Sequence, residues 1–146
     1  MRYALGLLLL GCGGAAKLEV GQELALEVEG FRLTEARAAE RAGAGGGRVV
    51  LFESERSRAE ARVTLETGRY EVTVVLDGPD RDHDAVFVAL EKDEYRVYPD
   101  AGDRGRLSPA ADRLEMCVPQ AGPVAISLRT AETGVALDRV VLKRLP

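Results

Sequence analysis

What this chain of 146 residues lacks excludes several classes of protein. It has no tryptophan, no asparagine, one histidine and two cysteines, and only 5% of its residues are aromatic. Two cysteines cannot supply the disulfide framework of a small secreted scaffold, and a single histidine does not indicate a histidine-rich metal centre. The longest apolar run, Ala4–Leu10, is far shorter than the ~20 residues that span a bilayer.

The chain also lacks any block of basic residues. Its formal net charge is −4, and its arginines are scattered among acidic residues. Binding to nucleic acid depends on a clustered positive surface, so this class of function is disfavoured. The length suits one domain, and a domain of this size can bury a sizeable core without disulfide bonds or metal ions to stabilise it.

The first residues have the order of an export signal. A positive Arg2 precedes the apolar run, which ends in Leu9-Leu10-Gly11-Cys12. This motif resembles the lipobox of bacterial lipoproteins, in which a small residue precedes the cysteine that accepts a lipid through its thiol. The resemblance implies a signal peptide over residues 1–11, lipidation of Cys12, a tether over 12–22 and a folded domain over 23–146.

Two other interpretations of the N-terminus stay open. One is ordinary secretion with cleavage after Ala16, and the other is an uncleaved, buried first strand. The expected location is therefore the bacterial cell envelope, as a membrane-anchored lipoprotein, or the exterior. The residue after Cys12 is Gly13 and not an acidic residue that would act as a retention signal. In a bacterium with two membranes this resembles the sequence of a lipoprotein routed to the outer membrane. Cys117, in an apolar pattern, is expected to be a small buried hydrophobe and not a partner for Cys12.

From Leu24 onward the dominant period of the apolar residues is two, which is typical of strands with one face in a core. Turn signals rich in glycine, proline and aspartate separate these runs. Seven or more short strands at this spacing predict an all-β fold, an antiparallel β-sandwich or jelly roll. The alternating runs lie at 24–28, 63–65, 70–76, 86–90, 114–118, 124–128 and 135–142.

Two segments interrupt this pattern. Thr34–Ala42 is rich in helix formers and has a threonine N-cap candidate, so one or two helical turns are expected there. Gly43–Gly47 is expected to be a flexible loop. It leads into a strand and not into a helix, so it lacks the helix N-terminus of a phosphate-binding loop.

Three groups of segments, in this order, resemble a known family. The first is Leu24–Phe31, the second is Thr67–Val72 with Asp82–Val88, and the third is 122–128 with the final strand 134–142. They resemble the β-jelly-roll carbohydrate-binding modules of families six and thirty-five, within the galactose-binding-like fold. The resemblance implies a non-catalytic domain that binds a glycan or polysaccharide.

In that family, acidic residues of the first and last strands surround a structural calcium ion. The matching positions here are Glu27, Glu29 and Asp138. Calcium takes several oxygen ligands, but carboxylates two apart on a strand point to opposite faces, so both glutamates can contribute only if the strand bends. The alternative is a solvated Glu29 and a Glu27 paired with a nearby arginine.

A second acidic cluster is 80–84, with aspartates at alternate positions around His83. The glycine and the closing glutamate of a calcium loop are missing, so a polar turn between two strands is the favoured interpretation. His83 has no second histidine or cysteine nearby and is expected to be a surface turn residue.

Sugar-binding modules stack sugar rings on exposed aromatic side chains and hold hydroxyl groups with polar ones. The candidates here are Asp93, Tyr95, Arg96 and Tyr98. Tyr95 and Tyr98 are three residues apart, so on a regular strand they face opposite sides and only one can stack on a given surface. Three further aromatic residues are assigned to the core: Phe31, Tyr70 and Phe87.

No nucleophile motif such as Gly-x-Ser-x-Gly occurs, and the histidine has no cysteine partner in its sequence context. We therefore expect no catalysis. Two functions remain: a surface-tethered carbohydrate-binding module, and a structural or protein-interaction lipoprotein of the envelope that binds no sugar.

Overall fold

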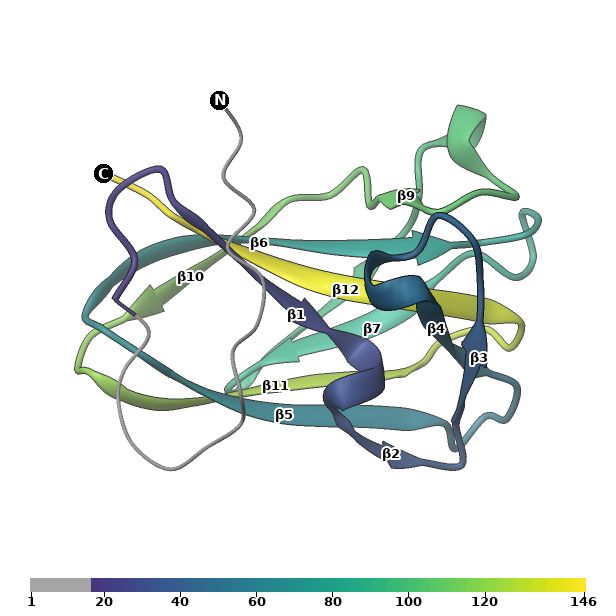
Figure 1. The fold of residues 1–146 in the computed structure, drawn as a ribbon, viewed down its shortest axis with the longest axis horizontal. Coiled ribbons are helices and arrows are strands. Elements are labelled where there is room, and N and C mark those ends of the chain that lie inside the picture. Colours follow the sequence, from purple (N-terminus) through teal and green to yellow (C-terminus); the bar gives the residue numbers. More distant parts are fainter. Residues whose placement is uncertain (1–16) are drawn as a thin grey trace.

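The computed structural model describes residues 17–146, which fold into two antiparallel sheets packed face to face (Figure 1). The predicted β-sandwich is confirmed. In one sheet the order is β10 (Leu114–Val118), β6 (Gly68–Asp77), β12 (Val135–Arg144), β4 (Arg48–Phe52) and β3 (Arg37–Glu40), with β1 (Glu23–Glu27) also on β12 and β9 (Ser108–Pro109) on β6. In the other it is β2 (Arg32–Thr34), β5 (Arg58–Leu65), β11 (Gly122–Thr130), β7 (Val86–Leu90) and β8 (Asp93–Val97).

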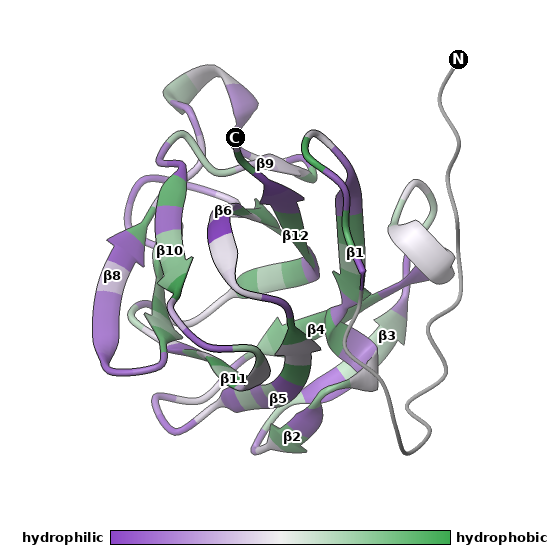
Figure 2. Ribbon diagram, turned by 90° about the vertical axis from the view of Figure 1, so that its left-hand side faces the viewer, coloured by the Kyte–Doolittle hydropathy of each residue, from purple (hydrophilic) through white to green (hydrophobic). Residues whose placement is uncertain are grey.

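The alternation of apolar residues along the strands builds the core between the sheets. Val72, Val74 and Leu76 of β6 point into it and are at most 1% exposed. Tyr70 is fully buried, and its hydroxyl donates a hydrogen bond to the carbonyl oxygen of Glu66 at 2.8 Å, so its polar atom is satisfied. In Figure 2 the edge strand β8 is largely hydrophilic, which protects that edge from pairing with another chain.

The helical turns expected over Thr34–Ala42 are not formed. The chain ends β2 at Thr34, turns at Glu35, which has a φ of 46°, and enters β3, which pairs with β4. Alanine methyl groups alone give a helix too little apolar surface to bury, whereas the same residues complete backbone hydrogen bonds at a sheet edge. Tertiary pairing therefore overrides the helix propensity of this segment.

Two residues assigned to the interior lie elsewhere. Phe87 is half-buried, because it belongs to the alternate face of β7 that points away from the other sheet. Cys117 is a free thiol exposed on the edge strand β10, where Met116 and Val118 take the inward positions. In both cases the residue type favoured burial but the strand register decided otherwise.

The N-terminal part of the described chain packs onto the sandwich. Leu18 is buried, and Arg144 donates a hydrogen bond through Nη1 to the Leu18 carbonyl oxygen at 2.6 Å. The packed body thus includes part of the segment predicted as a tether over 12–22. The predicted signal peptide and Cys12 lie outside the described residues. Within residues 17–146 no helix has the length and apolar character needed to cross a membrane.

Candidate functional site

The first candidate site lies beside β12 at Asp138, between the part of β12 that pairs with β4 and the part that pairs with β1. We call it the β12 gap. Along one edge, β12 pairs with β4 over Val135–Leu137 and with β1 from Arg139 onward. Its register against β6 on the other edge shifts between Leu137 and Arg139. Asp138 therefore sits at a bulge where one neighbouring strand ends and the next begins.

Three carboxylates gather at the β12 gap. Asp138 is 1% exposed, and its Oδ1 accepts a hydrogen bond from the Gly45 N–H at 2.9 Å. Glu27 pairs across the strands with Arg139, which also reaches Asp138 Oδ2 at 2.7 Å. After Glu27 the strand gives way to a 3₁₀ turn over Val28–Gly30, and this turn brings Glu29 beside Glu27.

The glycine-rich loop closes over these carboxylates. A Cβ atom placed on Gly45 would lie 2.8 and 2.9 Å from the two carboxylate oxygens of Glu27, and one on Gly46 would lie 2.9 Å from Glu29 Oε1. Larger residues at these positions would displace the acidic side chains. The loop predicted to be flexible thus lies against the acidic cluster, and its glycines leave room for the glutamate carboxylates.

The electrostatics of the β12 gap disfavour full ionisation. Burial raises the pKa of Glu27 most, and the negative charges of Asp138 and Glu29 raise it further. The positive charge of Arg139 lowers this pKa but does not cancel the rise. Burial also raises the pKa of Asp138, despite the Gly45 N–H and two arginines. The Oε2 atoms of Glu27 and Glu29 are buried without a hydrogen-bond partner. The gap therefore carries carboxylate oxygens that no protein group satisfies.

These oxygens are the observation that bears on the expected calcium. Unpartnered carboxylate oxygens suit Ca²⁺, which takes roughly six to eight oxygen ligands. As the side chains lie, however, no group of three acidic, histidine or cysteine residues within residues 17–146 could hold a metal ion. Both oxygens of Asp138 are engaged, one of them by Arg139. The residue types fit calcium, and Arg139 would have to release Asp138 to admit it.

The aspartates of 80–84 do not converge. Asp80 Oδ1 contacts His83 Nδ1 at 2.7 Å and accepts the Asp82 N–H at 2.9 Å, as in a tight polar turn. Asp84 points inward, is 2% exposed and pairs with Arg104 at 2.8 Å. His83 is exposed, and its hydrogen bond to Asp80 raises its pKa. The turn interpretation of this cluster agrees with these contacts.

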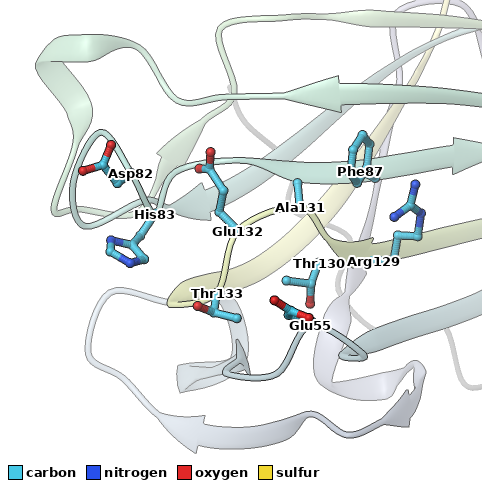
Figure 3. A pocket seen from close by; sticks show the side chains of 9 residues that line it. All are labelled: Glu55, Asp82, His83, Phe87, Arg129, Thr130, Ala131, Glu132 and Thr133. Carbon is cyan, nitrogen blue, oxygen red and sulfur yellow. The ribbon is translucent and has the colours of Figure 1, made fainter.

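The second candidate site is a hollow of about 410 Å³ at one end of the sandwich, which we call the loop-end pocket (Figure 3). Three strand connections and the end of β11 form it, and it lies at the opposite end from the first residues of β1 and the last of β12. Its lining residues are Glu55, Asp82, His83, Phe87, Arg129, Thr130, Ala131, Glu132 and Thr133.

Glu132 organises one wall of the loop-end pocket. Its Oε2 accepts the backbone N–H groups of Asp84 at 2.9 Å and Ala85 at 3.1 Å, which fixes the end of the β6–β7 loop. Its Oε1 accepts a hydrogen bond from Arg96 of β8 at 2.7 Å. One carboxylate therefore ties together the β6–β7 loop, the β11–β12 turn and β8.

The aromatic ring in the loop-end pocket is covered by an arginine. The guanidinium of Arg129 lies 4.0 Å from the centre of the Phe87 ring. A two-point ion pair with Glu94 holds it there, from Nε at 2.8 Å and from Nη2 at 2.5 Å. A sugar ring can stack on that face of Phe87 only if Arg129 moves, because its guanidinium occupies it.

The four residues predicted to bind ligand lie on or just after β8. Tyr95 packs against the core, and Tyr98 is 37% exposed, so the two rings do face different sides. Arg96 lies over both Phe87 and Tyr98, at 5.7 and 5.4 Å from their ring centres. Asp93 is exposed in the β7–β8 hairpin. Neither tyrosine lines the loop-end pocket, which these residues meet through Arg96 and its contacts with Glu132 and Phe87.

Sequence reasoning did not find the residues of the loop-end pocket as a set. The sequence indicates turns at Thr133 and around His83. Nothing in it distinguishes Glu55, Arg129 and Glu132 from other surface charges. Glu55 lies in the β4–β5 turn, whereas Arg129 lies near the end of β11 and Glu132 lies in the turn after it, so they meet only because β5, β11 and β7 are neighbours in one sheet. No local signal in the sequence marks such a meeting.

Neither the models of known families nor the curated proteins give a match to this sequence. Several solved structures share its fold. A β-(1,4)-mannanase of Podospora anserina, with a glycoside hydrolase family 26 part and a family 35 carbohydrate-binding module, aligns over 88% of this chain with 17% identity and a TM-score of 0.73. This chain covers 28% of that mannanase.

Two similar structures are isolated modules. The C-terminal family 6 carbohydrate-binding module of a laminarinase from Zobellia galactanivorans has 15% identity and a TM-score of 0.65, and the alignment covers 84% of this chain and all of the module. A family 35 carbohydrate-binding module from Clostridium thermocellum has 15% identity and a TM-score of 0.66, covering 82% of this chain and 98% of the module. The chain thus has the β-sandwich fold of carbohydrate-binding modules.

Proposed function

We propose that this protein is a non-catalytic carbohydrate-binding module that binds a glycan or polysaccharide at the loop-end pocket. The observation that carries the proposal is the pocket itself, a hollow of about 410 Å³ rimmed by polar side chains on a sandwich of this fold. Carboxylates at Glu55 and Asp82 can accept hydrogen bonds from sugar hydroxyls. Arg96 and Tyr98 would extend the binding surface along β8, because Arg96 joins Glu132 to the Tyr98 ring.

Absence of catalysis is part of the proposal. The hydrogen-bonding contact of the His83 ring within residues 17–146 is the carboxylate of Asp80, and no hydroxyl or thiol is aligned with the ring as a nucleophile. The carboxylates of the pocket lie on separate loops and hold backbone and arginine groups, or face solvent. This arrangement supports binding and positioning rather than turnover.

Retention on insoluble polysaccharides tests the proposal. The mannanase and the laminarinase among the similar structures suggest the probes: β-1,4-mannan and laminarin. We expect the wild type to be retained on at least one of them, and Glu55→Ala to weaken retention while Glu23→Ala, an exposed acid at the opposite end, leaves it unchanged. Tyr95→Ala, which alters a core-facing ring, and Tyr98→Ala separate fold effects from a contact along β8.

A competing function has one observation in its favour. Arg129 covers Phe87, and the chain has no tryptophan, so the pocket presents no bare aromatic platform for a sugar ring. A structural or protein-interaction lipoprotein of the envelope would need no such platform. If none of the polysaccharides, nor a glycan array, retains the wild type with or without calcium, this second function replaces the first.

We also propose a structural calcium ion at the β12 gap. Glu27, Glu29 and Asp138 would hold it, and the two unpartnered glutamate oxygens support the proposal. The ion would neutralise carboxylates that burial keeps at a raised pKa. Because a ligand of the folded state raises stability by mass action, the melting temperature should rise on addition of calcium and fall with a chelator. An unchanged melting temperature would show that the folded domain binds no calcium at this site.

Export and anchoring complete the proposal. Cys12, in the motif that resembles a lipobox, would carry the lipid and hold the sandwich at a membrane of the bacterial envelope. Mass spectrometry of the mature N-terminus tests this directly. A lipid-modified Cys12 is expected, whereas an unmodified start at Lys17 would leave export standing and remove the anchor.

A further inference from the structure

The loop-end pocket keeps an excess of negative charge after its ion pairs are counted. Glu132 is paired with Arg96 at 2.7 Å, and Arg129 is paired with Glu94 at 2.5 Å. Each of these pairs is neutral. His83 contacts Asp80 at 2.7 Å, so the protonated ring and that carboxylate also cancel.

Two carboxylates of the loop-end pocket are left over. Glu55 and Asp82 are exposed, and within residues 17–146 neither side chain forms an ion pair or accepts a hydrogen bond. They come from the β4–β5 turn and the β6–β7 loop, on different sides of the hollow (Figure 3). Arg56 and Arg81 follow and precede them in the chain, but their side chains do not line the pocket.

We infer that the loop-end pocket selects an amine-bearing sugar, such as a glucosamine unit, over its neutral N-acetylated form and over a uronic acid. This inference rests on the proposed glycan-binding function. A protonated amine brings three N–H donors and a positive charge to an acceptor-only carboxylate, and the amines of different units in one oligosaccharide can meet Glu55 and Asp82 separately. A sugar carboxylate would instead meet like charge in a hollow without a free cation, and the net charge of −4 adds to that repulsion.

Calorimetric titration with a matched series of oligosaccharides tests the inference. The probes are a glucosamine oligomer, its N-acetylated counterpart of equal length and an oligogalacturonate, at low salt and at about pH 6, where the amine is protonated. We expect the glucosamine oligomer to bind about threefold to tenfold more tightly than its neutral counterpart, as two exposed charge pairs to different amines allow. Added salt should shrink that ratio, because it screens exposed charges.

The double variant Glu55→Gln/Asp82→Asn keeps the shape and removes both charges. We expect it to bind the two forms equally, while Glu23→Gln, a single charge removed at the opposite end, preserves the preference. Equal binding of the two forms by the wild type, or a preference that survives in the double variant, would overturn the inference. Retention on neutral polysaccharides would in that case leave the proposed function intact, whereas no binding of any probe overturns both.

Discussion

Replacing Glu27 by glutamine should stabilise the domain in a chelator and abolish its stabilisation by calcium. Glu27 sits in the β12 gap with a buried, unpartnered Oε2 and beside two further carboxylates, so its charge is unfavourable when no cation is present. Glutamine keeps the size and removes the charge. We expect a gain of about 1 kcal/mol in the free energy of unfolding, typical of relieving one such defect.

That gain corresponds to a rise of about 3–6 °C in the melting temperature for a domain of this size. The wild type should instead gain about 2.7 kcal/mol in the presence of calcium at a hundred times the dissociation constant. Differential scanning calorimetry in chelator and in calcium measures both effects. The variant is therefore expected to be more stable than the wild type in one buffer and less stable in the other.

The pH dependence of the same pair of proteins gives an independent check. Because the pKa of Glu27 is raised in the folded state, protonation at lower pH stabilises the wild type, and this contribution is lost as pH rises through the raised pKa. The advantage of Glu27→Gln in chelator should therefore shrink as pH falls and vanish below the ordinary pKa of glutamate.

Glu23→Gln, on the same strand but exposed, is the control and should change neither midpoint. A lower midpoint of Glu27→Gln in chelator would contradict an unfavourable charge at Glu27. That result would mean that the attraction of the Arg139 charge on the neighbouring strand outweighs the burial of the Glu27 charge.

Three further predictions concern the loop end and the exposed edge. Gly78→Ala should destabilise the domain by about 2 kcal/mol or more in urea unfolding, because its Cβ would lie 2.5 Å from the Cα of Asp84; an unchanged midpoint contradicts this close packing. Glu132→Gln should speed hydrogen exchange at the Asp84 and Ala85 amides, which it accepts at 2.9 and 3.1 Å, and equal rates would mean that the loop is fixed otherwise. Cys117 should react fully with a thiol reagent in the native protein, and reaction only after unfolding would place it inside.

The sequence determined the fold class through its period of two. Strand after strand shows one apolar face, and β6 buries Val72, Val74 and Leu76 as that period requires. The period of two does not say which residues cover the outer face of a strand. Phe87, predicted to be in the core, lies on the outer face of β7 under Arg129. Which face of a strand is inward depends on its register with neighbours that are distant in sequence.

The candidate sites divide in the same way. The sequence, through its resemblance to carbohydrate-binding modules, singled out Glu27, Glu29 and Asp138, and the 3₁₀ turn after β1 supplies the bend that lets both glutamates face the β12 gap. Only the tertiary structure brought Glu55 and Asp82 to one hollow, and only it showed that Glu132 and Arg129 are already engaged there. Local pattern specifies that each strand has one apolar face, whereas a pocket between loops is set by which strands become neighbours.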